Sequence, residues 1–112
     1  MNQRDKLIIK YEKDLKEKFN IEPEMDLLRK VTIACGPAIY NRDSATISSS
    51  EESELERVKE NFLRKKLQLS DDLDFDTPLN SILETYGRTN RTKYRVVVYY
   101  LLVKHFSKED AY

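Results

Sequence analysis

Residues 90–106, NRTKYRVVVYYLLVKHF, contain the longest apolar run of the chain, which extends from Val96 to Val103. The run is rich in β-branched and aromatic residues, a composition that favours a β-strand. However, a strand needs neighbours for its backbone hydrogen bonds, and no other segment of the chain has a convincing strand pattern. We therefore predict a helix that is apolar on two sides. Such a helix normally lies at the centre of a bundle.

Four amphipathic segments are predicted to pack around this last helix. In each of them apolar residues recur at the three- and four-residue spacing of a helix, at residues 3–19, 23–35, 51–67 and 78–86. Their boundaries carry residues typical of helix starts (Pro23, one of Ser48 to Ser50, and Thr77) and of helix ends (Gly36 and Gly87). Residues 41–50 are polar and predict the longest loop. The sequence thus predicts an all-α fold, a single compact domain over residues 1–112 with about five helices and the last one central.

Composition supports one small domain. The chain has 112 residues, a length that suits one hydrophobic core. Its 20 Lys and Arg residues balance its 20 Asp and Glu residues, which argues against bulk electrostatic attraction to nucleic acid or a membrane. The apolar run is too short to span a bilayer, and the N-terminus lacks the pattern of a signal peptide. The single Cys35 fits a reducing compartment, so we expect a cytoplasmic protein without membrane association.

A dense basic cluster surrounds the predicted start of the last helix, and consists of Arg88, Arg91, Lys93 and Arg95. Thr89 or Asn90 is expected to cap that helix, which places the cations near its positive end, where they are unfavourable. One interpretation is an anion site, in which helix N–H groups, guanidinium groups and Asn90 hold a phosphate or carboxylate. The other, which we favour, is an internal salt-bridge network with the acidic segment Asp71–Asp76.

No catalytic or metal-binding pattern is recognisable. Cys35 lies on the apolar face of its predicted helix and His105 lies near the end of the last one, so both are interpreted as structural. One histidine and one cysteine are too few for a zinc site of those ligands. Residues 72–76 begin like a calcium loop, but the required glycine and the final glutamate are missing. We predict no catalytic residue, no metal and no cofactor.

Segments along nearly the whole chain carry a family resemblance. They are DLL (26–28), GPAIYN (36–41), NFLRKKL (61–67), YGR (86–88) with NR (90–91), and KYR (93–95) with YYLLVKHF (99–106). Together they resemble a family of short bacterial proteins, domain of unknown function 2853. The resemblance implies a compact, multihelical, bacterial and cytoplasmic protein. It implies no catalytic or binding residues.

Three functions are compatible with these patterns. We favour a non-catalytic protein-interaction module, with an unknown partner or a homodimer, because charge is balanced, tyrosines are frequent and Ile9 lies off the apolar face of its helix. The alternative is binding of an anion, a phosphate or a nucleic acid, through Arg88, Asn90, Arg91, Lys93 and Arg95. An enzyme is the least favoured, since no base and nucleophile pair can be named.

Overall fold

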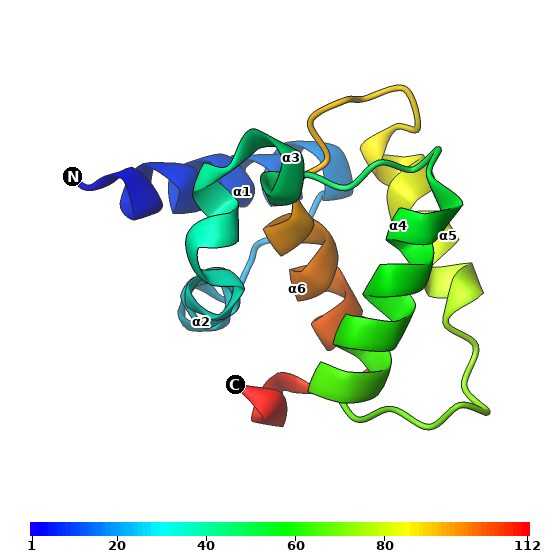
Figure 1. The fold of residues 1–112 in the computed structure, drawn as a ribbon. Coiled ribbons are helices and arrows are strands. Elements are labelled where there is room, and N and C mark those ends of the chain that lie inside the picture. Colours follow the sequence, from blue (N-terminus) through cyan, green and yellow to red (C-terminus); the bar gives the residue numbers. More distant parts are fainter.

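The computed structural model describes residues 1–112 and consists of helices joined by turns and loops, without a β-strand (Figure 1). The elements are α1 (Gln3–Phe19), α2 (Met25–Cys35), η1 (Gly36–Tyr40), α3 (Arg42–Ala45), α4 (Glu52–Arg57), η2 (Val58–Lys66), α5 (Asp76–Tyr86), α6 (Arg95–His105) and η3 (Glu109–Ala111). The predicted all-α class is therefore confirmed. The only β-type pairing is an isolated antiparallel bridge between Thr46 and Tyr94. None of the helices combines the length and the apolarity that crossing a bilayer requires.

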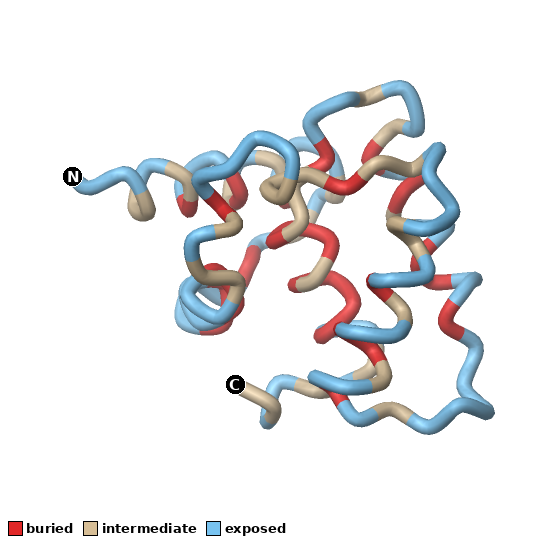
Figure 2. The backbone as a smooth tube through the Cα atoms, in the orientation of Figure 1, coloured by how far each residue is buried: buried red, intermediate tan, exposed pale blue.

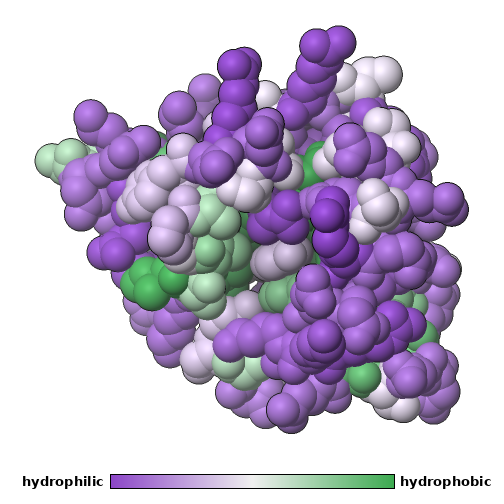
Figure 3. Space-filling model, in the orientation of Figure 1, coloured by the Kyte–Doolittle hydropathy of each residue, from purple (hydrophilic) through white to green (hydrophobic).

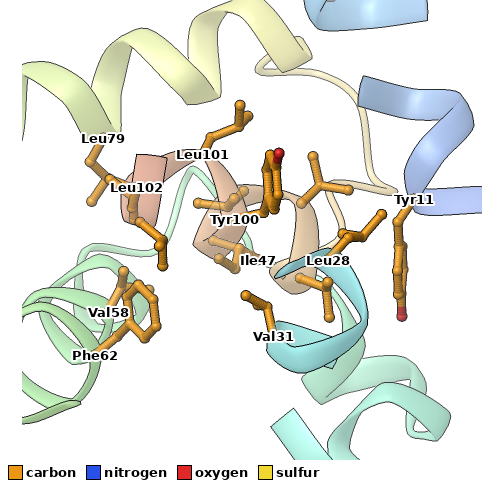
Figure 4. Close-up of a cluster of buried hydrophobic side chains, with 14 of the residues drawn as sticks. Tyr11, Leu28, Val31, Ile47, Val58, Phe62, Leu79, Tyr100, Leu101 and Leu102 are labelled. Carbon is orange, nitrogen blue, oxygen red and sulfur yellow. The ribbon is translucent and has the colours of Figure 1, made fainter. Parts of the chain in front are cut away.

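Helix α6 lies at the centre of the bundle, as the sequence predicts. It packs against α2 and α5 and also contacts α1 and α3. Its buried residues form an apolar surface on all sides, and are Val96, Val97, Val98, Tyr100, Leu101, Leu102 and Val103. Figure 2 shows this concentration of buried residues along α6, and Figure 4 shows side chains of α2, η2 and α5 converging on it. Each fully buried Val or Leu contributes about 1.5–3 kcal/mol, so this helix dominates the stability of the core.

Helices α4 and η2 form one continuous rod from Glu52 to Lys66. The sequence predicts a helix over 51–67, and the extent is confirmed, but η2 has π-helical geometry, which periodicity cannot reveal. The amide of Leu67, for example, donates to the carbonyl oxygen of Phe62 at 2.9 Å. The Phe62 ring stacks on Tyr99 of α6 with 3.7 Å between ring centroids. This contact fixes the rod against the central helix.

Helices α2 and α5 begin at other residues than predicted, and at each start a side chain binds a backbone amide. Helix α2 begins at Met25 rather than at Pro23, since Glu24 is extended and its N–H donates to the Tyr100 hydroxyl at 2.9 Å. Helix α5 begins at Asp76 rather than beyond Thr77. The carboxylate of Asp74, which precedes the N-cap residue Phe75, accepts the N–H of Thr77 at 3.0 Å. Both helix ends at glycine, Gly36 and Gly87, are as predicted.

The polar segment 41–50 is only partly a loop. Asn41 caps a single helical turn, α3, by accepting the N–H of Asp43 at 3.0 Å. After α3 the chain is extended at Thr46 and then turns into α4, which follows Glu51 and has no serine cap. The predicted capping role of Ser48, Ser49 or Ser50 is therefore wrong. The serines lie in the connection that forms one wall of the groove described next.

Candidate anion-binding groove

A groove of about 1060 Å³ lies between two connections that are distant in sequence, residues 45–51 and 88–94. The isolated bridge between Thr46 and Tyr94 joins these connections. The amide of Ile47 donates to the carbonyl oxygen of Lys93 at 2.9 Å, and the Ser49 hydroxyl donates to that of Arg88 at 3.1 Å. Figure 1 shows the two connections converging above α6. We call this feature the inter-loop groove.

Cationic and hydroxyl-bearing side chains dominate the lining of the inter-loop groove. The cations are Arg42, Arg57, Arg88, Arg91 and Lys93. Hydroxyl and amide groups come from Thr46, Ser48, Ser49, Ser50, Thr89, Asn90 and Thr92, and three carboxylates come from Asp43, Glu51 and Glu54. Figure 3 shows strongly hydrophilic side chains projecting from the upper edge of this face, over the same connections. The local excess of positive charge contrasts with the zero net charge of the chain.

The predicted start of the last helix is wrong, and this changes the setting of the basic cluster. Helix α6 begins at Arg95, after Tyr94, so neither Thr89 nor Asn90 caps it. The Asn90 side chain instead accepts the N–H of Thr92 at 2.9 Å and stabilises a turn within the preceding loop. Of the basic residues only Arg95 lies in the helix. A site built on helix N–H groups is therefore not formed by this cluster.

Arg95 connects the start of α6 to segments that line the groove. Its Nε donates to the carbonyl oxygen of Ser44 at 2.7 Å and its Nη1 donates to the Tyr99 hydroxyl at 3.0 Å. Its Nη2 forms an ion pair with Glu54, and the Arg95 side chain is only 18% exposed. Its Nη2 also donates to the carbonyl oxygen of Thr46 at 3.4 Å, so four partners engage this largely buried guanidinium. Arg95 therefore positions the wall of the groove and is not one of its exposed cations.

Lys93 is similarly enclosed, with 3% of its surface exposed. Its ammonium donates to the carbonyl oxygens of Arg88, at 3.3 Å, and of Asn90. Burial, with a smaller effect from the nearby Arg88, lowers the pKa of Lys93 below its usual value. These bonds close the loop on itself, so Lys93 fixes the shape of the groove wall.

The exposed cations differ in their partners. Arg88 pairs with Glu84 and donates to the Asn80 side chain at 3.1 Å, and Arg57 pairs with Glu54 at 2.9 Å. Arg42 and Arg91 are exposed and form no ion pair. Arg42 and Arg57 were absent from the predicted site. No sequence pattern could identify them, because contacts between residues distant in sequence, such as the Thr46–Tyr94 bridge and the Ile47–Lys93 hydrogen bond, bring their segments to this loop.

The acidic segment expected to neutralise the basic cluster lies elsewhere. Asp71 pairs with Arg64 at 2.7 Å, and Asp76 pairs with Lys59 at 2.8 Å. Both interactions are on the rod formed by α4 and η2, and the 67–75 connection lies at the opposite end of that rod from the 88–94 loop (Figure 1). The expected pairing is therefore wrong, and the carboxylates that contact the cluster are Glu54 and Glu84.

Residues 10–110 match the model of a family described as "Protein of unknown function (DUF2853)". The chain belongs to this family. The matched range contains the whole inter-loop groove of this DUF2853 protein. No curated protein matches the chain.

Outside the groove, the DUF2853 protein has one apolar pocket, of about 260 Å³, between α2, η2 and α6. It is lined by Ala34, Cys35, Asn61, Phe62, Lys66, Tyr99 and Tyr112. Burial raises the pKa of the Cys35 thiol to about 11. A thiol with such a pKa is mostly protonated at neutral pH and therefore a poor nucleophile. The chain has no group of three or more His, Cys, Asp or Glu side chains placed to hold a metal ion.

Proposed function

We propose that the inter-loop groove binds an anion that carries phosphate groups. The observation that carries the proposal is the position of Arg42 and Arg91. Arg42 comes from α3 and Arg91 from the 88–94 loop; both line the same groove, are exposed, and pair with no carboxylate. Guanidinium groups present a planar fork that matches phosphate oxygens with two parallel hydrogen bonds.

The surroundings of Arg42 and Arg91 favour such a ligand in two ways. Thr89, Thr92 and Ser48 add hydroxyl donors at the rim of the groove. The walls are also held in place before any ligand arrives, since Arg95 and Lys93 bond to backbone carbonyls on both sides. Preorganised donors lose less conformational entropy on binding.

Titration with pyrophosphate tests the proposal directly. Amide resonances of a uniformly ¹⁵N-labelled sample should shift at residues 42–51 and 88–94, and the protein should gain thermal stability. Arg42→Gln and Arg91→Gln should each weaken binding by about tenfold, equivalent to roughly 1.4 kcal/mol. Arg29→Gln is the matched control, because Arg29 is an exposed arginine of α2 that pairs with Asp5 outside the groove.

Two results would contradict the proposal. One is an absence of shifts at both connections at millimolar pyrophosphate. The other is binding that Arg42→Gln and Arg91→Gln leave as strong as the control does. Glu51→Gln tests independently whether the ligand is negatively charged. Removing this carboxylate from the lining should strengthen the binding of an anion.

A second candidate function, self-association, is favoured by a different surface. Ile33 and Tyr40 are 50% and 49% exposed, and they lie on α2 and η1, which follow each other directly in the chain. Figure 3 shows apolar side chains gathered over α2 and η1 at the left of this face. Ile9 of α1 is 48% exposed, in agreement with its predicted position off the buried face. Half-exposed apolar residues of this kind mark protein contacts when they gather in a patch.

Sedimentation across a dilution series tests this second candidate. The mass should rise toward that of a homodimer with concentration, and Ile33→Glu should keep the protein monomeric. Leu73→Glu is the control, because Leu73 is 42% exposed but lies in the 67–75 connection. A monomer at every concentration would exclude the homodimer.

A further inference from the structure

The 88–94 loop has a second basic cleft on its other side. This cleft, of about 480 Å³, lies between the loop and helix α1. It is lined by Lys10, Lys13, Asp14, Glu17, Lys18, Asn90, Thr92 and Tyr94. Asn90, Thr92 and Tyr94 also line the inter-loop groove. The loop is thus a ridge with a basic depression on either side.

The cations of the α1 cleft are partly free. Lys10 and Lys18 are exposed and form no ion pair, whereas Lys13 pairs with Glu17 at 3.8 Å. Asp14, the other carboxylate of the cleft, accepts a hydrogen bond from the Tyr86 hydroxyl. Unpaired cations therefore stand on both sides of the ridge: Lys10 and Lys18 on one, Arg42 and Arg91 on the other.

We propose that a linear polymer of phosphate groups crosses the 88–94 ridge and occupies the inter-loop groove and the α1 cleft together. The inference rests on the proposed function of the groove and names its ligand class. A single phosphate could reach only one depression, whereas a flexible chain of phosphates can pass over the exposed Arg91 and Thr92 and contact both. Single-stranded nucleic acid and inorganic polyphosphate share this chemistry.

The lining argues against an acidic peptide as the occupant. Most of the binding energy of protein partners comes from a few large side chains that fill well-packed pockets. Ala45, Ile47 and Tyr94 are the only apolar or aromatic residues of the groove, and Ile47 is 1% exposed. Hydroxyl, amide and guanidinium donors prevail instead, and these suit phosphate oxygens spaced along a backbone.

Length dependence of binding provides the test. Oligothymidylates from two to about 16 nucleotides cover the usual site sizes for single strands. Their affinity should rise with length until both depressions are filled. A ligand that contacts all four unpaired cations should bind less tightly as the salt concentration rises. A plot of the logarithm of the affinity against the logarithm of the salt concentration should have a slope of about −3. Sodium polyphosphate of matched length distinguishes the two sources of phosphate: equal binding assigns the site to the phosphate chain alone, and tighter oligothymidylate binding assigns it to nucleic acid.

Variants on α1 separate this inference from the proposed function. Lys10→Gln with Lys18→Gln should weaken binding of the longest oligothymidylate about tenfold and leave pyrophosphate binding unchanged. The control is Lys6→Gln with Lys30→Gln, which removes two exposed lysines outside both depressions.

Three outcomes would overturn the inference. In the first, the α1 variant leaves the affinity for the longest oligothymidylate unchanged, while Arg42→Gln and Arg91→Gln reduce it. That result would still support the proposed function of the groove. The second is affinity independent of length. The third is equal binding of polyglutamate at matched charge, which would assign the surface to acidic peptides. Failure of pyrophosphate to bind would instead contradict the proposed function of the groove.

Discussion

Arg95 donates from Nε to the carbonyl oxygen of Ser44 over 2.7 Å, and this bond ties the start of the central helix to α3. The same guanidinium reaches Thr46, Tyr99 and Glu54. Arg95, which sequence alone assigns to a binding cluster, is therefore a largely buried residue that connects the central helix to neighbouring segments. Its removal should affect the fold before it affects any ligand.

Arg95→Met should lower the free energy of unfolding by roughly 2–4 kcal/mol, because it leaves Glu54 and two backbone carbonyls without their donor. Arg95→Lys should recover only part of the loss, since an ammonium cannot reproduce the fork. Urea denaturation measures both. In the control, Arg29→Met removes an exposed pair, with an expected cost below about 1 kcal/mol. Equal effects at the two sites would contradict the structural role of Arg95.

Tyr86→Phe should destabilise the protein by about 1–3 kcal/mol. The Tyr86 hydroxyl donates to the Asp14 carboxylate at 2.5 Å and accepts the N–H of Tyr94 at 3.2 Å, so its removal leaves two partly buried groups unpaired. The edge-to-face contact of the ring with Phe19 stays. Tyr40→Phe, at a half-exposed site without a hydrogen bond from its hydroxyl, should change stability by less than about 0.5 kcal/mol.

Lys93→Met should loosen the 88–94 loop without removing an anion contact. The ammonium closes the loop through the carbonyls of Arg88 and Asn90, so hydrogen exchange of the Asn90 and Thr92 amides should accelerate. Pyrophosphate affinity should fall less than in Arg91→Gln. A larger loss in Lys93→Met than in Arg91→Gln would show that the ammonium itself meets the ligand.

Stability should fall in alkaline solution, beginning near pH 9. Burial raises the pKa of Cys35 to about 11 and raises the pKa values of Tyr11, Tyr86, Tyr99 and Tyr112. Above the ordinary pKa of each group the unfolded chain releases a proton that the folded chain retains, so the free energy of unfolding decreases. Each such group contributes about 1.4 kcal/mol per pH unit within its window. Lys93 acts in the opposite direction, since its pKa is lowered. Urea denaturation between pH 7 and about pH 11 measures the slope.

Tyr11→Phe isolates one of these groups. The Tyr11 side chain is fully buried and its hydroxyl forms no hydrogen bond within the chain. At neutral pH the substitution should therefore be neutral or stabilising by up to about 1 kcal/mol. Above about pH 10 it should reduce the alkaline loss of stability. If the variant loses as much free energy of unfolding in alkali as the wild type does, Tyr11 does not contribute to the alkaline loss of stability.

Much of the fold is predictable from local pattern. The first helix has the predicted bounds, Gln3–Phe19, because its apolar spacing and its Asn2 cap are local features. The helix starts at Met25 and Arg95 escaped prediction. Tyr100, distant in sequence, binds the amide just before the first, and Lys93 closes the loop that precedes the second. The π geometry of η2 likewise has no signature in apolar periodicity.

The candidate site is less predictable from sequence than the fold is. Arg88 and Arg91 could be selected from sequence, but the roles of Lys93 and Arg95 depend on burial. Arg42 and Arg57 join the site through tertiary contacts such as the Thr46–Tyr94 bridge. The all-α class and the central α6 are predictable from sequence, because apolar runs and helical spacing are properties of neighbouring residues. Which cations pair, which are buried and which face solvent depends on the folded chain, because charges interact with groups within a few ångströms, however distant in sequence.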